Sequence, residues 1–230
     1  TIGACSKQPE VISEAQAKQT GSATSRDAPI VVELYQSQGC SSCPPANAAV
    51  NAVAERPGII ALSFAVTYWD RLGWKDVFAD KAFTQRQYDY AHSLGNSNVY
   101  TPQIVINGKA DLTGIKRGEL TRALDAATPI KGGPALEILP QEIRVGAGSG
   151  SANIWLVRYD PRTQNVAVRS GENSGRTLPH KNIVRSLVKL GEWSGRSIRL
   201  KLPLPDQKDL KNVVLVQRQG AGPIIAAKSF

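Results

Sequence analysis

The chain has no methionine, only two histidines and only three cysteines among its 230 residues. No apolar run approaches the roughly 20 residues that cross a bilayer as a helix, so we expect the mature chain to be soluble. A nucleophile elbow and a glycine-rich phosphate loop are also absent, which leaves hydrolase and kinase functions without support. Because methionine is missing and the chain starts at Thr1, we expect that an initiator region has been removed.

Acidic residues are scarce in the second half only. Residues 1–132 carry 13 Lys and Arg against 12 Asp and Glu, whereas residues 133–230 carry 15 against 7. This excess favours anionic partners such as a membrane surface with acidic head groups, although a solvated basic surface is the simpler interpretation. The basic residues are dispersed, without a nucleic-acid-binding motif or interleaved aromatic side chains, so we expect no nucleic-acid partner.

Two of the cysteines lie where a predicted strand turns into a predicted helix. Residues 30–36 form an apolar run typical of a buried strand, and residues 44–55 form an alanine-rich run typical of a helix. Cys40 and Cys43 lie between these elements, separated by two serines. The positive end of a helix dipole favours ionisation of a nearby thiol, so we predict that Cys40 is the reactive cysteine. Cys43 is close enough to form a disulfide with it.

The third cysteine lies near the start of the chain. Ile2-Gly3-Ala4-Cys5 resembles the end of a bacterial lipoprotein signal, in which Cys5 would carry the lipid; a stray cysteine near a flexible end is the alternative. The following residues are polar, and we predict that residues 1–28 form a flexible export-remnant tether. We therefore expect an exported bacterial protein, periplasmic or secreted.

Strands and helices alternate through the rest of the first half. We predict strands at residues 59–66, 104–106 and 110–112 and helices at residues 80–94 and 116–127. Asn107-Gly108 is a favoured two-residue turn, so the last two of these strands form a hairpin.

A loop dense in aromatic and charged residues follows the second predicted strand. Residues 67–78 contain four aromatic and four charged side chains. The loop leaves the carboxyl end of that strand, the sheet edge where ligands bind in open α/β folds. Tyr68, Trp69 and Trp74 would enclose the cysteines or hold a substrate peptide, with Asp70 as a proton acceptor. Alternatively, these side chains only attach a long loop to the protein.

This order of elements, with the cysteine pair before the first helix and Thr101-Pro102 before the hairpin, resembles the thioredoxin superfamily over about residues 30–130. The resemblance implies that Pro102 follows a cis peptide bond and that its loop faces the disulfide. It also implies that Thr101 presents backbone groups to a substrate strand. An ordinary trans turn before a strand is the alternative.

A narrower resemblance covers more of the chain. The segments VVELYQSQGCSSCPPANA, YWDRLGW and VYTPQIVING resemble the exported bacterial family called domain of unknown function 1223. Residues 171–176 and 182–185 extend this resemblance into the second half. The resemblance implies a fold and a site, but no reaction. No tryptophan precedes Cys40 and the intervening pair is Ser-Ser, so the direction of electron transfer stays open.

The second half is predicted to be rich in β-structure. Gly132-Gly133-Pro134 is a boundary, after which short β-forming runs alternate with turns, the spacing typical of a β-sandwich. We therefore predict an α/β thioredoxin-like domain at residues 29–131 and a mostly β, sandwich-like domain at residues 132–230. His180 falls in a predicted loop, and we expect it to lie at the surface, as we do for His92 on its helix.

Three functions are compatible with the cysteine pair. In the first, the protein is a thiol–disulfide oxidoreductase acting on protein thiols or disulfides, with the redox-active disulfide Cys40–Cys43 and no other cofactor. In the second, the two thiolates capture Cu(I), as in a metallochaperone. In the third, the disulfide is permanent and the protein is a non-catalytic binding module. A closed zinc site has little support, because it needs four ligands and the remaining soft donors are Cys5, His92 and His180.

Overall fold

The structure, a computed structural model, describes residues 28–204 and 207–230. Cys5 and nearly all of the predicted tether lie outside the described residues, so the predicted lipid attachment stays a prediction. No helix in the described part of the chain is long and apolar enough to cross a membrane.

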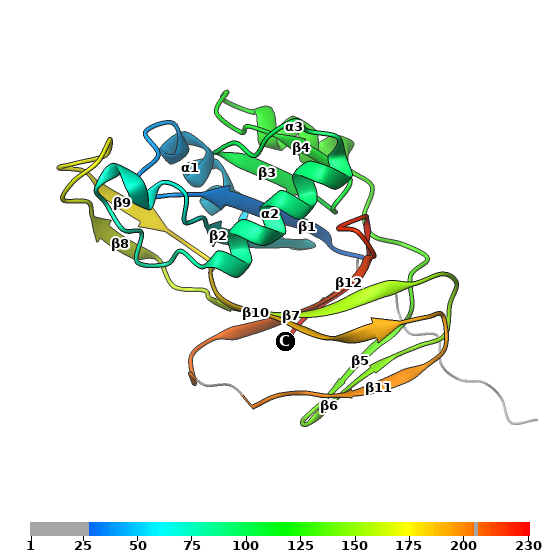
Figure 1. The fold of residues 1–230 in the computed structure, drawn as a ribbon. Coiled ribbons are helices and arrows are strands. Elements are labelled where there is room, and N and C mark those ends of the chain that lie inside the picture. The colour runs from blue at the N-terminus through cyan, green and yellow to red at the C-terminus, as the bar shows by residue number, and fades with distance from the viewer. Residues whose placement is uncertain (1–27, 205–206) are drawn as a thin grey trace, which may run out of the picture.

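One mixed sheet of eight strands is the centre of the fold (Figure 1). Its strand order is β13-β12-β7-β10-β2-β1-β3-β4. Parallel pairing joins β1 to β2, and antiparallel pairing joins β1 to β3. The strands are β1 (Ile30–Gln36), β2 (Ile59–Ala65), β3 (Gln103–Ile106), β4 (Ala110–Leu112), β7 (Ala152–Asp160), β10 (Ile183–Trp193), β12 (Lys211–Arg218) and β13 (Ile224–Ser229).

Helices cover both faces of the first half of this sheet. Helix α1 (Cys43–Val53) and helix α3 (Glu119–Ala126) pack on one face, in a cluster that includes Val32 and Ile104 of the sheet. Helix α2 (Lys81–Leu94) packs on the other face through Phe83 and Tyr90. Strand β1 is therefore buried on both sides, which explains why its sequence is almost continuously apolar.

Local signals set the ends of these helices. The Asp80 side chain accepts a hydrogen bond from the backbone N–H of Ala82 at 2.7 Å and so caps the start of α2. Gly95 ends α2 in the left-handed conformation, with φ of 74°. Helix α3 is shorter than the predicted helix at residues 116–127, because Gly118 precedes it with φ of 74°, outside the helical region.

A second layer of strands packs on the other half of the main sheet. Strands β5 (Leu136–Leu139), β6 (Glu142–Val145) and β11 (Ile198–Lys201) form a three-stranded sheet. Ile143 of β6 shares a buried cluster with Leu156 of β7 and with Trp193. A separate two-stranded sheet joins β8 (Gln164–Ala167) to β9 (Thr177–His180), and the sequence analysis missed β9.

The main sheet runs across the predicted boundary between residues 131 and 132. Strand β10 of the second half pairs with β2 of the first, with Ile183 opposite Ser63. The Ser63 N–H donates to the Asn182 carbonyl at 2.9 Å, and the Asn182 side chain donates to the Ala61 carbonyl at 2.9 Å. The fold is therefore mixed α/β with a large central sheet and additional β-rich regions, and the division into two domains stays a prediction.

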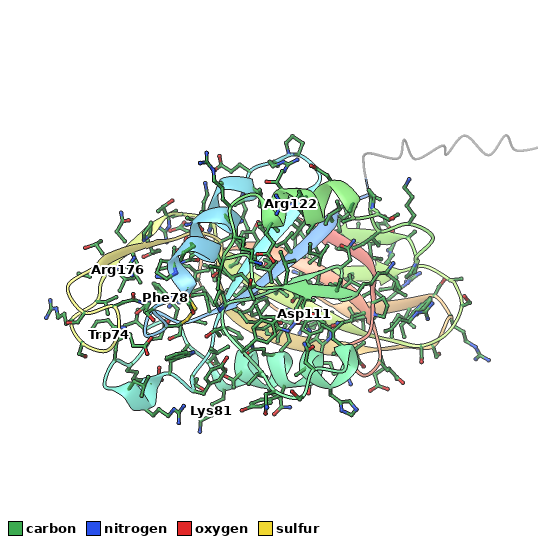
Figure 2. All side chains as sticks on the ribbon, turned by 90° about the horizontal axis from the view of Figure 1, so that it is seen from above. Trp74, Phe78, Lys81, Asp111, Arg122 and Arg176 are labelled. Carbon is green, nitrogen blue, oxygen red and sulfur yellow. A yellow bond between two sulfur atoms is a disulfide. The ribbon has the colours of Figure 1, made fainter. Side chains whose placement is uncertain are left out.

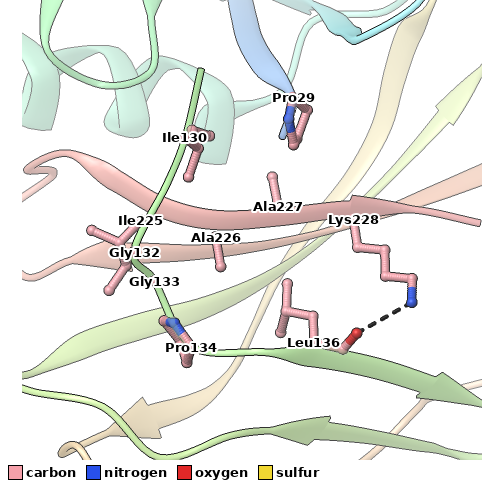
Figure 3. A pocket seen from close by; sticks show the side chains of 10 residues that line it. All are labelled: Pro29, Ile130, Gly132, Gly133, Pro134, Leu136, Ile225, Ala226, Ala227 and Lys228. Carbon is pink, nitrogen blue, oxygen red and sulfur yellow. Dashed lines mark hydrogen bonds between the residues drawn. The ribbon is translucent and has the colours of Figure 1, made fainter. Parts of the chain in front are cut away.

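A pocket of about 220 Å³ lies where the chain passes between the two halves (Figure 3). Gly133 lines it, and a Cβ atom at this position would lie 1.7 Å from the carbonyl oxygen of Ile225, so the close approach requires glycine. Lys228, at the rim, donates to the Leu136 carbonyl at 3.2 Å. None of the predicted site residues lines this pocket.

Candidate functional site

Cys40 and Cys43 form a disulfide in the turn that joins β1 to α1. Helix α1 begins at Cys43, so Cys40 lies just ahead of the first turn rather than within it. The Cys43 N–H donates to the Cys40 carbonyl at 3.2 Å, which closes this turn. Cys40 is 0% exposed and Cys43 is 2% exposed, so a partner cannot reach either sulfur in this conformation.

The Thr101-Pro102 loop lies against the disulfide. The peptide bond between these residues is cis. The Thr101 hydroxyl donates to Cys40 Sγ at 3.3 Å, and the Ser42 hydroxyl donates to the Thr101 carbonyl at 3.4 Å. These contacts join the cysteine turn to a loop that is about 60 residues away in the sequence.

The aromatic loop, residues 67–78, contributes two indole N–H groups to the region around the cysteines. Trp69 Nε1 donates to the Thr101 hydroxyl at 2.7 Å. Trp74 Nε1 donates to the side-chain carbonyl of Gln38 at 2.8 Å. The Tyr68 hydroxyl donates to Gln87 at 3.2 Å, and burial raises its pKa to about 12, so this phenol stays neutral at physiological pH.

Asp70, the predicted proton acceptor, forms a hydrogen bond within the aromatic loop. Its carboxylate accepts the Asp76 N–H at 3.0 Å. Asp76, which the sequence analysis did not select, lies closer to the cysteine turn, because its carboxylate accepts the Gln38 N–H at 2.7 Å. Burial raises the pKa of Asp76 to about 6.

Residues 168–176, the cover loop between β8 and β9, bring the second half onto the cysteine turn. Asn173 is 0% exposed, and its amide donates to the carbonyls of Gln38 at 2.9 Å and Cys40 at 2.8 Å. The Glu172 carboxylate accepts the Ser41 N–H at 3.0 Å, and hydrogen bonding from the side chain and the backbone of Ser41 lowers the pKa of Glu172. Figure 2 shows the result at one end of the molecule, where Trp74 and Phe78 of the first half lie on the same side as Arg176 of the cover loop.

The structure thus brings most of the predicted site residues together. Thr101 contacts Cys40 and is followed by Pro102, and Trp69 contacts Thr101. Trp74 contacts Gln38 before the cysteines, and Tyr68 contacts Gln87 of α2. Sequence reasoning missed Glu172 and Asn173 as site residues. Their signal was the resemblance of residues 171–176 to the same family as the cysteine segment.

The prediction that His180 lies at the surface is wrong. His180 belongs to β9 and is 0% exposed, whereas His92 is exposed as predicted. The alternation of β9 turns Leu178 and His180 inward, and His180 Nδ1 lies 2.8 Å from the Asn47 side-chain amide of α1. This hydrogen bond satisfies one nitrogen of the buried ring, whereas Nε2 has no partner among the described residues.

His180 makes the stability of the fold dependent on pH. Burial lowers the pKa of His180 to about 4, whereas a histidine in the unfolded chain titrates near ~6.5. Between these values the unfolded chain binds more protons, so this contribution to stability is lost as pH falls from about 6.5 to about 4. From pH 7 to pH 4 we expect the wild type to lose about 3 kcal/mol more unfolding free energy than His180→Gln, measured by urea denaturation.

Asp76 changes the pH dependence of the unfolding free energy with the opposite sign. Its raised pKa makes the folded state bind more protons than the unfolded chain in part of the range between pH 7 and pH 4. It is present in both proteins and cancels in the comparison. Parallel stability curves for the wild type and His180→Gln would contradict the assignment to His180.

Within residues 28–204 and 207–230, no group of three or more His, Cys, Asp or Glu side chains is arranged to hold a metal ion.

The fold and the site together define a class of protein. It is a mixed α/β protein in which a disulfide of CxxC spacing lies buried between a helix start, a cis-proline loop and a loop from the second half. The chain belongs to the family described as protein of unknown function (DUF1223), whose profile matches residues 31–217. Comparison with curated proteins gives no match.

Two solved structures are similar to this chain. Protein AGR_C_4864 from Agrobacterium tumefaciens is 31% identical, with 89% of this chain and 94% of that chain covered and a TM-score of 0.74. HBP35 of Porphyromonas gingivalis is 12% identical, with 89% of this chain and 75% of that chain covered and a TM-score of 0.54. The second likeness concerns the fold alone.

Proposed function

We propose that the protein is a thiol–disulfide oxidoreductase that acts on protein thiols or disulfides through Cys40 and Cys43. The observation that carries this proposal is the hydrogen bond from the Thr101 hydroxyl to Cys40 Sγ, just ahead of the start of α1. A hydroxyl donor and a helix N-terminus both favour a negative charge on this sulfur, and the thiolate is the reactive form of cysteine.

The reaction is a two-electron exchange. The reduced Cys40 thiolate attacks one sulfur of a partner disulfide, which forms a Cys40–partner disulfide and releases the other partner sulfur as a thiolate. Cys43 then loses its proton and attacks Cys40 Sγ, which forms the Cys40–Cys43 disulfide and releases the second partner thiolate. The partner gains two electrons and the cysteine pair loses two; the reverse sequence oxidises a partner dithiol.

The arrangement of the first half supports a thioredoxin-like unit at residues 29–131. The elements from β1 to α3 occur in the predicted order, and β1 pairs with β2 and β3 in the middle of the sheet. Thr101 would orient the partner chain, with the aromatic loop as one wall. We also propose that the protein is exported and meets its partners outside the cytoplasm. The basic second half would favour binding to an anionic membrane surface.

Trapping of mixed disulfides tests the reaction. In Cys43→Ala, the second attack is blocked, so we expect partner proteins to accumulate on Cys40 when the variant is expressed in an exporting host. Non-reducing electrophoresis should show these adducts, and reductant should release them. Cys40→Ala/Cys43→Ala is the matched control and should give none. An absence of adducts in Cys43→Ala would contradict the proposal.

A second candidate is a non-catalytic binding module with a permanent Cys40–Cys43 disulfide. Its support is the burial of both cysteines, together with the two hydrogen bonds that Asn173 donates to the carbonyls of Gln38 and Cys40. The reduction potential separates the two functions, because structural disulfides in secreted proteins lie below about −300 mV whereas exchange proteins lie above this value. A reduction potential below about −300 mV, together with a failure to trap partners, would favour the binding module.

A further inference from the structure

Trp69, Thr101 and Cys40 form a chain of two hydrogen bonds. The indole Nε1 of Trp69 lies 2.7 Å from Thr101 Oγ1, and Oγ1 lies 3.3 Å from Cys40 Sγ. The three side chains come from the loop after β2, the loop before β3 and the turn before α1, so the contact exists only in the folded protein.

The chemistry of these groups fixes the direction of both bonds. An indole N–H can only donate, so Thr101 Oγ1 must accept from Trp69. A hydroxyl has one proton, and the lone pair of Thr101 facing Trp69 is occupied by that bond. The Thr101 proton is then directed toward Cys40 Sγ, which accepts it. The Tyr68 hydroxyl is a second polar neighbour of the Thr101 side chain, and its own proton is donated to Gln87.

Trp69 is held in place independently of Thr101. Its carbonyl accepts the Leu72 N–H at 2.9 Å in the short 3-10 turn η1 (Asp70–Leu72), and its side chain packs against the cluster around Phe64 and Phe83. The indole N–H therefore approaches the Thr101 hydroxyl from a position that is set by contacts other than those with Thr101 and Cys40.

We propose that Trp69 is a positioning residue that orients the Thr101 hydroxyl, so that this hydroxyl donates to the Cys40 thiolate once the disulfide is reduced. The proposal deepens the proposed function, since it names what favours ionisation of the attacking sulfur beyond the helix. Trp69 acts on Cys40 through Thr101 and not by contact with a partner.

A double-mutant cycle tests this coupling. The apparent pKa of Cys40 is measured in full-length reduced protein carrying Cys43→Ala, from the pH dependence of iodoacetamide alkylation, read by mass spectrometry on the peptide that contains Cys40. The four proteins are this background alone and with Trp69→Phe, Thr101→Val, or both. Thr101→Ser, which keeps the hydroxyl, is the conservative variant.

We expect Thr101→Val to raise the apparent pKa of Cys40 by about one unit, because a hydrogen bond to the charged form is lost. Trp69→Phe should raise it by about half a unit, because the hydroxyl becomes free to rotate. Trp69→Phe should have no further effect when Thr101→Val is already present, and Thr101→Ser should stay near the background value.

A shift on Trp69→Phe that persists in the Thr101→Val protein would overturn the proposal, because it would show that Trp69 acts by packing or solvent exclusion. An unchanged pKa in either single variant would overturn it as well. If Trp69→Phe does not fold, the comparison of Thr101→Val with Thr101→Ser decides, since equal pKa values would remove the hydroxyl from the mechanism.

The outcome does not depend on a partner protein. Alkylation measures the ionisation of Cys40 alone, whereas the trapping of adducts measures exchange. A coupled pKa without trapped partners would support this inference and contradict the proposed function, and the reverse result would do the opposite.

Discussion

Replacing Arg86 with methionine is expected to lower the free energy of unfolding by about 3–5 kcal/mol, which is the usual loss when one partner of a buried ion pair is removed. Arg86 on α2 and Glu33 on β1 are 4% and 0% exposed, and Arg86 Nε lies 2.9 Å from a Glu33 carboxylate oxygen. A second guanidinium nitrogen donates to Gln217 of β12 at 3.0 Å. Methionine fills similar space but leaves the Glu33 carboxylate inside the fold without a cation.

Urea denaturation of Arg86→Met measures this loss. Lys81→Met, on the exposed start of the same helix, is the matched control and should change stability by less than about 0.5 kcal/mol. Glu33→Leu/Arg86→Met should recover most of the stability, because neither charge of this pair stays buried without its partner. A single variant as stable as the control would contradict the importance of this pair.

Replacing Asn173 with alanine is expected to accelerate reduction of the Cys40–Cys43 disulfide by dithiothreitol about 5- to 150-fold. Both cysteines are buried, and the cover loop is attached to the cysteine turn, so we expect reduction to require movement of this loop. Asn173 makes two buried hydrogen bonds to the cysteine turn, at 2.9 Å and 2.8 Å. Each contributes about 0.5–1.5 kcal/mol, and their loss favours the open loop by the corresponding factor.

The rate of disulfide reduction is measured by stopping the reaction at successive times and alkylating the thiols that have been released. Ser174→Ala is the matched control, because Ser174 is exposed in the same loop and its hydroxyl donates to the Arg169 carbonyl rather than to the cysteine turn. We expect its rate to equal that of the wild type. Equal rates in Asn173→Ala and Ser174→Ala would show that the cover loop does not limit access.

Local patterns in the sequence predict the elements of the first half well. The apolar run at residues 30–36 is β1 with the predicted bounds, and the predicted helix at residues 80–94 differs from α2 by its capping residue Asp80 only. These features depend on neighbours within a few positions, which a sequence shows directly. The position of the cysteine pair, in the turn between β1 and α1, follows from the same local patterns on either side of it.

Contacts between distant segments were harder to predict. Asn173 reaches Cys40 over 133 positions, and His180 reaches Asn47 over the same separation. His180 is a polar residue between turn-forming residues, a pattern typical of a surface loop. Its burial results from the packing of β9 on α1, which the local pattern does not show. The same reasoning applies to β10, which lies in the half predicted to be rich in β-structure but whose place beside β2 no local pattern shows.

The pairing of β10 with β2 has a consequence for how the molecule can be divided. A fragment that stops at residue 131 would leave β2 as an edge strand, with free backbone groups along an apolar segment that invites pairing with other chains. Strand β10 occupies part of this edge, so we expect the second half to limit self-association of the first as well as to supply the cover loop.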